Sequence, residues 1–210
     1  MTITHHLDDA TLMSFAAGSL PNALAAIAAA HVAGCPRCRR ELRMLERIGG
    51  ALVSALPPAT LDRSQPAMPE ITDLPAPAPA PTTAAELPPS LSQLIGGGLD
   101  EVRWRWIGPG LWHRPLKIGG EGSLQLIKAA PGASVPEHTH GGSEITLVLR
   151  GALIDSTGRY EPGDVADVDE DIEHTPVADA EAGCICVIAN EQPTRFRGLL
   201  ARLMQPWHGL

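Results

Sequence analysis

Apolar residues recur at three- and four-residue steps in the first part of the chain, which is the spacing of an amphipathic helix. The clearest case follows Pro36, and a proline suits the first turn of a helix because its missing N–H has no partner to lose there. The sequence therefore predicts a helix from Pro36 onward, whose apolar stripe consists of Leu42, Leu45, Ile48, Leu52 and Leu56.

Two further helices are predicted before this one. Asp8 or Asp9 can cap the first, because an aspartate side chain accepts N–H groups at a helix start, and Gly18 can end it. The second has Pro21 in its first turn and runs to Gly34. Such a short helical unit has few residues to bury, so it is expected to need a staple or a partner.

The helical pattern is lost between Pro57 and Pro89, which enclose ten of the twenty prolines. Proline removes a backbone donor and fixes φ, so this segment suits neither a long helix nor a central strand. We interpret it as a semi-rigid extended linker. The predicted domains are a helical domain (residues 1–56), a linker (57–98) and a larger C-terminal domain (99–210).

Beyond about Trp104, short apolar runs alternate with glycine, proline and aspartate turns. Short strands at fairly even spacing are typical of closed barrels and sandwiches. The expected fold class is α+β and multidomain, with a small helical bundle followed by an all-β barrel. The predicted strands lie at residues 123–129, 144–150, 151–155, 164–168 and 184–190.

The composition narrows the classes of function. The formal net charge of -8 argues against a nucleic-acid binder, since contact with phosphates needs a basic surface. No basic segment followed by an apolar run opens the chain, and no stretch is apolar enough to span a membrane. We expect a cytoplasmic protein without membrane or direct nucleic-acid partners, whose four cysteines are thiols or metal ligands.

A first candidate metal site is the motif H-x3-C-x2-C formed by His31, Cys35 and Cys38. A helical step brings His31 and Cys35 to one face, and the C-x2-C turn brings Cys38 to the same point. Three such ligands suit tetrahedral zinc, with His6 as the obvious fourth ligand and His5 as the alternative. The competing interpretations are free thiols beside incidental histidines, or a redox C-x2-C, which usually lies in a βαβ unit.

A second candidate metal site lies in the β-rich part. His138 and His140 alternate along an extended segment, so their side chains point to the same face, and Glu144 can reach that face. His174 follows a turn at Pro162–Asp164. Three imidazoles and a carboxylate can hold Zn, Fe, Mn or Ni, and ligand type alone does not choose among them.

Cys184 and Cys186 alternate along a predicted strand, so both face one side of the sheet. They are either two small core residues or an oxidation sensor near the second metal site. A reactive thiol needs exposure and a lowered pKa.

These motifs carry a resemblance to known families. The pattern G-x5-H-x-H-x3-E-x6-G from Gly132 to Gly151, with the later PGD and His, resembles the two cupin motifs over roughly residues 100–205. The H-x3-C-x2-C unit resembles zinc anti-sigma domains over roughly residues 1–56. Together with the segments MTITHH, EVRWR, ITLVLRGA and EHTPV, they make the chain similar to the ChrR-type family of zinc anti-sigma factors.

The resemblance implies a cupin jelly roll after the zinc domain, and a regulator rather than an enzyme. It implies that an extracytoplasmic-function sigma factor is held inactive and is released on singlet oxygen or organic hydroperoxide stress. Pro66 and Pro69 depart from the family pattern, because they interrupt the expected fourth helix. The implied ligands are His6, His31, Cys35 and Cys38 for zinc, and His138, His140, Glu144 and His174 for zinc or another divalent transition metal.

The basic residues of the third helix are either a solvated face or a contact for acidic patches of the sigma factor; they include Arg37, Arg40, Arg43 and Arg47. The rival function is a metal-dependent cupin dioxygenase or isomerase with a helical appendage. Iron with oxygen consumption would favour that enzyme. A sugar-binding module is disfavoured by the shortage of aromatic residues, one Tyr and two Phe.

Overall fold

The computed structural model describes residues 2–59, 87–135, 141–169 and 175–192, and the backbone of 138–139 and 195–196. Its helices are α1 (Asp9–Ala16), α2 (Asn22–Gly34), α3 (Pro36–Ser54), α4 (Pro89–Ile95) and the 3-10 helix η1 (Leu99–Glu101). Its strands are β1 (Arg105–Gly108), β2 (Leu111–Leu116), β3 (Ser123–Ala129), β4 (His138–Thr139), β5 (Glu144–Gly151), β6 (Leu153–Asp155), β7 (Gly158–Tyr160), β8 (Val165–Val168), β9 (Val177–Ala178), β10 (Cys184–Asn190) and β11 (Arg195–Phe196).

The three predicted N-terminal helices are present. Asp8 caps α1, since its Oδ1 accepts the N–H of Thr11 at 2.6 Å, and Gly18 follows the helix with a φ of 68°. Pro36 opens α3 as expected, whereas Pro21 lies just before α2 rather than in its first turn. Arg39 of α3 then donates to two carbonyls at the end of α2, those of Val32 and Ala33.

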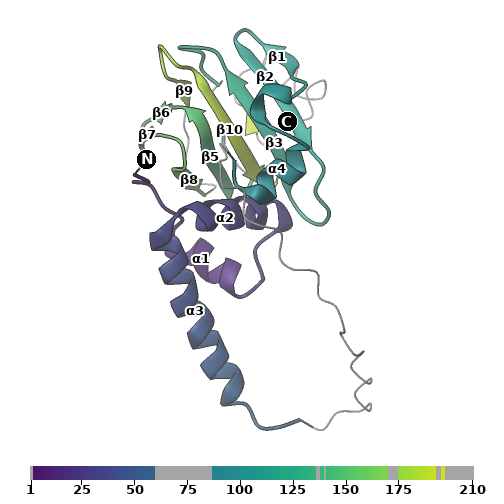
Figure 1. The fold of residues 1–210 in the computed structure, drawn as a ribbon, viewed down its shortest axis with the longest axis vertical. Helices are drawn as coiled ribbons and strands as arrows, with labels where there is room; N and C mark the ends of the chain where they lie inside the picture. Colours follow the sequence, from purple (N-terminus) through teal and green to yellow (C-terminus); the bar gives the residue numbers. More distant parts are fainter. Residues whose placement is uncertain are drawn as a thin grey trace.

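The β-rich part consists mainly of a six-stranded antiparallel sheet in the order β1-β2-β3-β10-β5-β8 and a three-stranded sheet in the order β7-β6-β9 (Figure 1). Alternate residues of the large sheet point toward the small one and form a common apolar core with it. That core includes Ile127, Val148 and Cys186 of the large sheet, and Leu153 and Tyr160 of the small one. The expected α+β fold class, helices followed by an all-β domain, is confirmed.

The opposite face of the large sheet is covered by the helices. α2 lies across β10 and β5, and its apolar residues join those of the sheet in one continuous core (Figure 1). Leu24 and Ile27 of α2 are fully buried, as is Val187 of β10. The small helical unit therefore has the partner that its size requires.

α4 lies within the range that the sequence assigned to the linker. The prolines at 88 and 89 do not prevent it, because they occupy the helix start, where no N–H donor is needed. Leu91 of α4 is fully buried, and α4 packs against α2. Residues 60–86 lie outside the described residues. They include Pro66 and Pro69, which are expected to interrupt the fourth helix of the family pattern.

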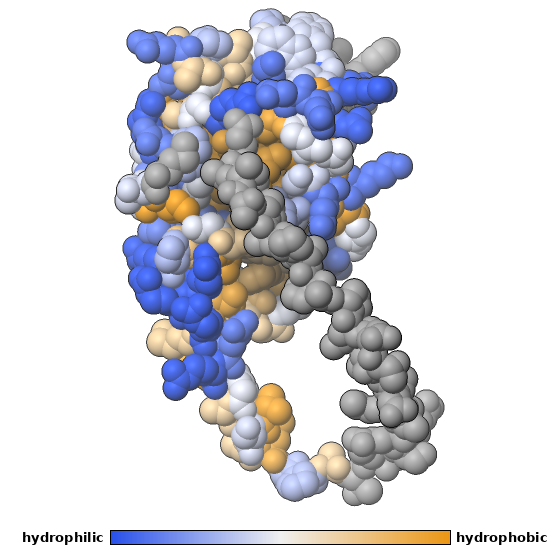
Figure 2. All heavy atoms as spheres, in the orientation of Figure 1, coloured by the Kyte–Doolittle hydropathy of each residue, from blue (hydrophilic) through white to orange (hydrophobic). Residues whose placement is uncertain are grey.

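α3 differs sharply between its two ends. Leu42 and Leu45 pack against the core, but the helix then runs away from the sheet (Figure 1). From the middle of α3 onward, large apolar side chains reach solvent (Figure 2), with exposed fractions of 52–69%. These exposed residues are Met44, Ile48, Leu52 and Val53 of α3, and Leu56 just beyond its end. No helix among the described residues has both the length and the apolar character needed to cross a membrane.

Candidate metal centre

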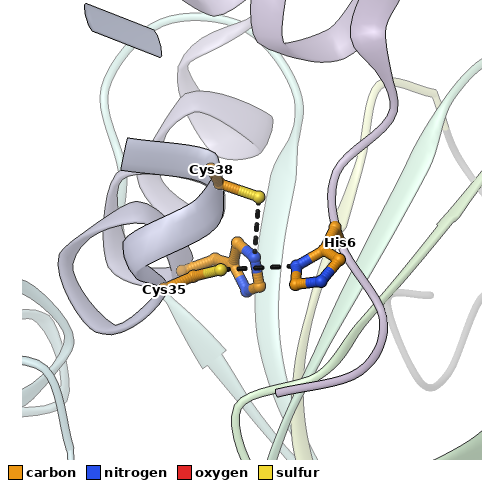
Figure 3. Close-up of side chains that lie close together, drawn as sticks. His6, Cys35 and Cys38 are labelled. Carbon is orange, nitrogen blue, oxygen red and sulfur yellow. Dashed lines mark hydrogen bonds between the residues drawn. The ribbon is translucent and has the colours of Figure 1, made fainter. Parts of the chain in front are cut away.

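Four residues from three parts of the chain converge at the start of α3: His6, His31, Cys35 and Cys38. Their candidate ligand atoms all lie within 4.8 Å of one another. Figure 3 shows His6 on the extended arm before α1 facing the two cysteines across a small gap. The structure thus brings together the set that sequence spacing suggested.

Local conformation places each side chain. His31 lies in the last turn of α2, and Cys38 lies in the first turn of α3. Cys35 lies between the two helices in extended conformation, with φ -101° and ψ 108°. That single extended residue turns the chain from one helix into the next, so that all three donors face the same point.

The spacing within the cluster fits a tetrahedral metal ion. His31 Nε2 lies 3.3 Å from Cys38 Sγ, and Cys35 Sγ lies 3.3 Å from His6 Nδ1. In a tetrahedral zinc site with ordinary bond lengths, nitrogen and sulfur ligands lie about 3.6 Å apart. Two thiols and two imidazoles provide the four ligands of a closed site, and only His6 among them is partly exposed.

His5 takes another position. Its Nδ1 lies 3.4 Å from Oδ2 of Asp164, and its ring lies 4.4 Å from the ring of Tyr160. Of the two alternatives for the fourth ligand, the structure brings His6 to the cluster and turns His5 toward the cupin domain.

Burial sets the protonation of the cluster. It lowers the pKa of His31 and of His6, so both imidazoles are neutral and able to coordinate at neutral pH. Burial, followed by the neighbouring Cys35, raises the pKa of Cys38 to about 12, although the N–H of Leu7 opposes this. A metal ion must therefore displace a proton from Cys38 when it binds.

The residues behind the ligands were missed by the sequence analysis, which identified Pro162–Asp164 only as a turn. The carbonyl of Gly163 accepts from His31 Nδ1 at 2.9 Å. Asp164 Oδ1 accepts the N–H groups of Thr4 at 2.7 Å and of His5 at 3.0 Å. Burial alone would raise the pKa of Asp164, but N–H donors from Glu161, His5 and Thr4 lower it.

The second predicted site is described only in part. Glu144 is buried at the start of β5, on the face that points into the cupin core, and Thr146 donates to its Oε1 at 3.4 Å. His140 and His174 lie outside the described residues, and His138 is described only as backbone in β4. Sequence analysis overlooked two further buried polar residues of the interior, His113 and Gln125, whose side chains approach at 3.3 Å.

Cys184 and Cys186 lie in β10 with their side chains in the cupin core. Both are buried, and the hydrogen bond that the Cys186 thiol donates to Cys184, together with burial, raises the pKa of Cys186 well above its usual value. Neither property is typical of a reactive thiolate. The four arginines singled out in the third helix, Arg37, Arg40, Arg43 and Arg47, are exposed, and Arg37 pairs with Glu41 at 3.1 Å.

Comparison with known proteins extends this description. Residues 93–194 match the family model described as the ChrR cupin-like domain. The anti-sigma-E factor ChrR of Cereibacter sphaeroides is 39% identical over 210 residues, which cover 99% of both chains. The chain belongs to the ChrR family.

The ChrR likeness extends to three dimensions. The solved structure of Rhodobacter sphaeroides SigE in complex with the anti-sigma ChrR matches with a TM-score of 0.73 and 37% identity, over 90% of this chain and 99% of that one. KdgF from Halomonas sp. matches 45% of this chain and 91% of its own, with 21% identity and a TM-score of 0.40. The ChrR match thus includes both the helical and the cupin parts.

Proposed function

We propose that this chain is an anti-sigma factor that binds an extracytoplasmic-function sigma factor through its N-terminal domain. A relative named as an anti-sigma factor matches it over nearly its whole length. The matching solved chain was crystallised in complex with a sigma factor. This match over both parts favours a regulator over the alternative of a cupin dioxygenase or isomerase with a helical appendage.

The exposed end of α3 is the observation that supports this function most directly. Four large apolar residues of α3 reach solvent there with exposed fractions of 52–69%, and Met44, Ile48 and Leu52 follow one another at four-residue steps on one face. Such a face is typical of helices that bind a partner. Arg40, Arg43 and Arg47 lie beside it and can contact acidic patches of the partner.

The metal that we propose for the N-terminal site is zinc. The set of two thiols and two imidazoles fits it, and a closed site without a position for substrate fits a structural role. Zinc would fasten the arm that carries His6 to the joint between α2 and α3. It would thereby stabilise the base from which the exposed end of α3 extends.

The cupin domain is proposed to sense singlet oxygen or organic hydroperoxide and to trigger release of the sigma factor. Its proposed metal ligands are His138, His140, Glu144 and His174, with zinc or another divalent transition metal. Glu144 supports this role, since it is buried on the face that points into the interior of the β domain, and a carboxylate is a suitable ligand for such a metal ion. Cys184 and Cys186 would take part in sensing only if oxidant reached the core.

Binding of the sigma factor can be tested on α3. The double variant Ile48→Asp/Leu52→Asp places two charges on the apolar face, and we expect at least a 100-fold loss of affinity for the cognate sigma factor, measured by calorimetry. Trp106→Asp is the matched control, because Trp106 is also apolar and 58% exposed but lies on β1.

The control variant should bind within about threefold of the wild-type chain. Equal binding by the double variant and the wild type would show that this face of α3 is not the docking surface. If the full-length, zinc-loaded chain binds no sigma factor encoded beside it or elsewhere in its genome, the proposed function itself is wrong.

Release can be tested on Glu144. We expect Glu144→Ala to bind the sigma factor as the wild type does but to keep it after treatment with organic hydroperoxide or photosensitised singlet oxygen. The readout is the complex remaining on gel filtration, and the cupin metal content is measured alongside. Release from the variant at the wild-type rate would exclude the cupin carboxylate from sensing.

A further inference from the structure

One turn of the cupin domain contacts both His31 of the N-terminal metal cluster and the arm that carries His6. This turn, Pro162–Asp164, connects β7 to β8 and lies more than 120 residues from His31 and the arm in the sequence. Its carbonyl at Gly163 meets His31, and its carboxylate at Asp164 meets the arm that carries His6. The two imidazoles of the cluster are therefore both placed by the same three-residue turn.

The contact at Gly163 determines which nitrogen of His31 can bind metal. A carbonyl oxygen only accepts hydrogen bonds, so Nδ1 of His31 must carry the proton that it donates at 2.9 Å. The lone pair of the neutral ring is then on Nε2, the atom that lies 3.3 Å from Cys38 Sγ. Hydrogen bonds of this kind fix the ring orientation and increase the basicity of histidine ligands in metal sites.

The contact at Asp164 holds the other imidazole through the backbone. Its Oδ1 accepts the N–H groups of Thr4 and His5, directly before His6, and the Thr4 hydroxyl donates to Oδ2 at 3.2 Å. Asp164 is buried, and its Oδ2 also accepts the N–H of Glu161, the residue directly before the turn. The arm and the turn are thus joined by one desolvated carboxylate, whose hydrogen bonds are stronger for that reason.

We propose that Gly163 and Asp164 are positioning residues of the N-terminal metal site, and that through them the cupin domain controls how tightly the helical domain holds its metal. This inference rests on the proposed zinc site at His6, His31, Cys35 and Cys38. It assigns the coupling between the two domains to direct contacts between the turn and the ligands.

A short path leads from the turn into the cupin interior. β8 begins directly after Asp164, and its first residue, Val165, pairs with Leu147 of β5. Its last residue, Val168, pairs with Glu144, the described member of the candidate cupin site. The turn and Glu144 therefore lie at opposite ends of a four-residue strand, about 10 Å apart along it. A shift of β8 caused by a change at Glu144 would displace the carbonyl and the carboxylate that place the ligands.

Asp164→Ala in the full-length chain tests this positioning role. We expect its zinc affinity to fall about 10- to 100-fold in competition with a chromophoric chelator, with faster zinc transfer. Asp164→Asn keeps an oxygen that can accept the N–H groups of Thr4 and His5, so it should recover most of the loss. If the alanine variant folds poorly, zinc affinity can still be measured with the asparagine variant.

Asp179→Ala is the matched control. Asp179 also holds a cupin turn, because it accepts the N–H groups of Glu181 and Ala182 and pairs with Arg159 at 2.8 Å. If the role of Asp164 were only to stabilise the cupin, both alanine variants would lose zinc equally. We expect Asp179→Ala to bind zinc within about twofold of the wild type.

A further variant probes the carbonyl. Gly163 has a φ of +95°, and a Cβ there would lie 3.0 Å from Cγ1 of Ile3, so Gly163→Ala strains the turn that presents the carbonyl. We expect a loss of zinc affinity comparable to that of Asp164→Ala. Unchanged zinc affinity in both Asp164→Ala and Gly163→Ala overturns the inference, whether or not the chain binds a sigma factor. A wild-type chain that binds zinc but no sigma factor overturns only the proposed function.

Discussion

Cys35 and Cys38 are as deeply buried as Cys184 and Cys186, with exposed fractions of 1%, 0%, 3% and 3%. In each pair one thiol has a raised pKa: burial raises that of Cys38 to about 12, and the hydrogen bond with Cys184, together with burial, raises that of Cys186 well above its usual value. Depth and protonation therefore do not distinguish the pairs. If burial alone determined chemistry, both would be inert.

The neighbours of the two pairs differ. Cys35 and Cys38 face the imidazoles of His6 and His31, neutral donors that share a metal ion with thiolates. Cys186 lies near the carboxylate of Glu144, which contributes to its raised pKa. The first pair also lies at a joint between an extended arm and two helices, whereas the second lies in a strand paired on both sides.

The largest expected difference is in zinc binding. Cys38→Ser should abolish stoichiometric zinc at the N-terminal site and lower the melting temperature by more than 10 °C, because structural zinc contributes on the order of 10 kcal/mol to folding. Cys186→Ser should keep that zinc. Metal analysis after gel filtration and thermal unfolding monitored by circular dichroism measure both effects. Equal zinc loss in the two variants would contradict the distinction between the pairs.

A smaller difference is expected in thiol reactivity. A chelator that removes zinc should make Cys35 and Cys38 accessible, because the arm with His6 then loses its attachment to the joint between α2 and α3. Cys184 and Cys186 should stay protected until the cupin unfolds, since β10 pairs with β3 and β5 along its length. Titration with a disulfide reagent should therefore report two of the four thiols within minutes.

The reaction rate of Cys184 and Cys186 also tests whether they can act as an oxidation sensor. If Cys184 and Cys186 react as fast as the first pair in the zinc-free native chain, the core is open to small oxidants and a sensing role gains support. If they react more than 100-fold more slowly, their role in the native state is packing. Variants that replace Cys35 and Cys38 assign the signals to each pair.

Local features of the sequence predicted much of the first site. The cap at Asp8, the proline at the start of α3 and the spacing of His31, Cys35 and Cys38 each act within a few residues. The choice between His5 and His6 required the structure, because it depends on Asp164, which lies 159 residues from His5. Contacts of that separation leave no periodic signal in a single sequence.

The packing between the two parts was also beyond sequence pattern. The unbroken apolar run of β10 indicates a strand that is buried on both faces, but it does not say what covers the second face. That cover is α2, whose alanine-rich surface lies across the sheet. α4 was missed because its proline-rich start resembles the preceding segment, and β1 and β2 were missed because polar residues interrupt their apolar pattern.

The smallest expected effect concerns how the arm beside the first pair is held. Asp167 of β8 accepts the N–H of Asp8, and burial raises its pKa from 3.8 to about 6. The folded state thus favours the protonated carboxyl, so this group stabilises the fold fully below about pH 4 and loses that contribution as the pH rises through 6. Asparagine does not ionise and keeps an accepting oxygen. We therefore compare the free energies of unfolding of Asp167→Asn and the wild type at each pH. From pH 4 to pH 7, this difference should shift in favour of the variant by about 2 kcal/mol.

Urea unfolding of both chains at matched zinc concentration measures this gain, because the zinc contribution cancels in the difference between them. A flat difference for Asp167→Asn would mean that Asp167 is hydrated in solution. The arm beside Cys35 and Cys38 would then be fastened to the cupin by Asp164 rather than by both carboxylates, and zinc would carry a larger share of that attachment.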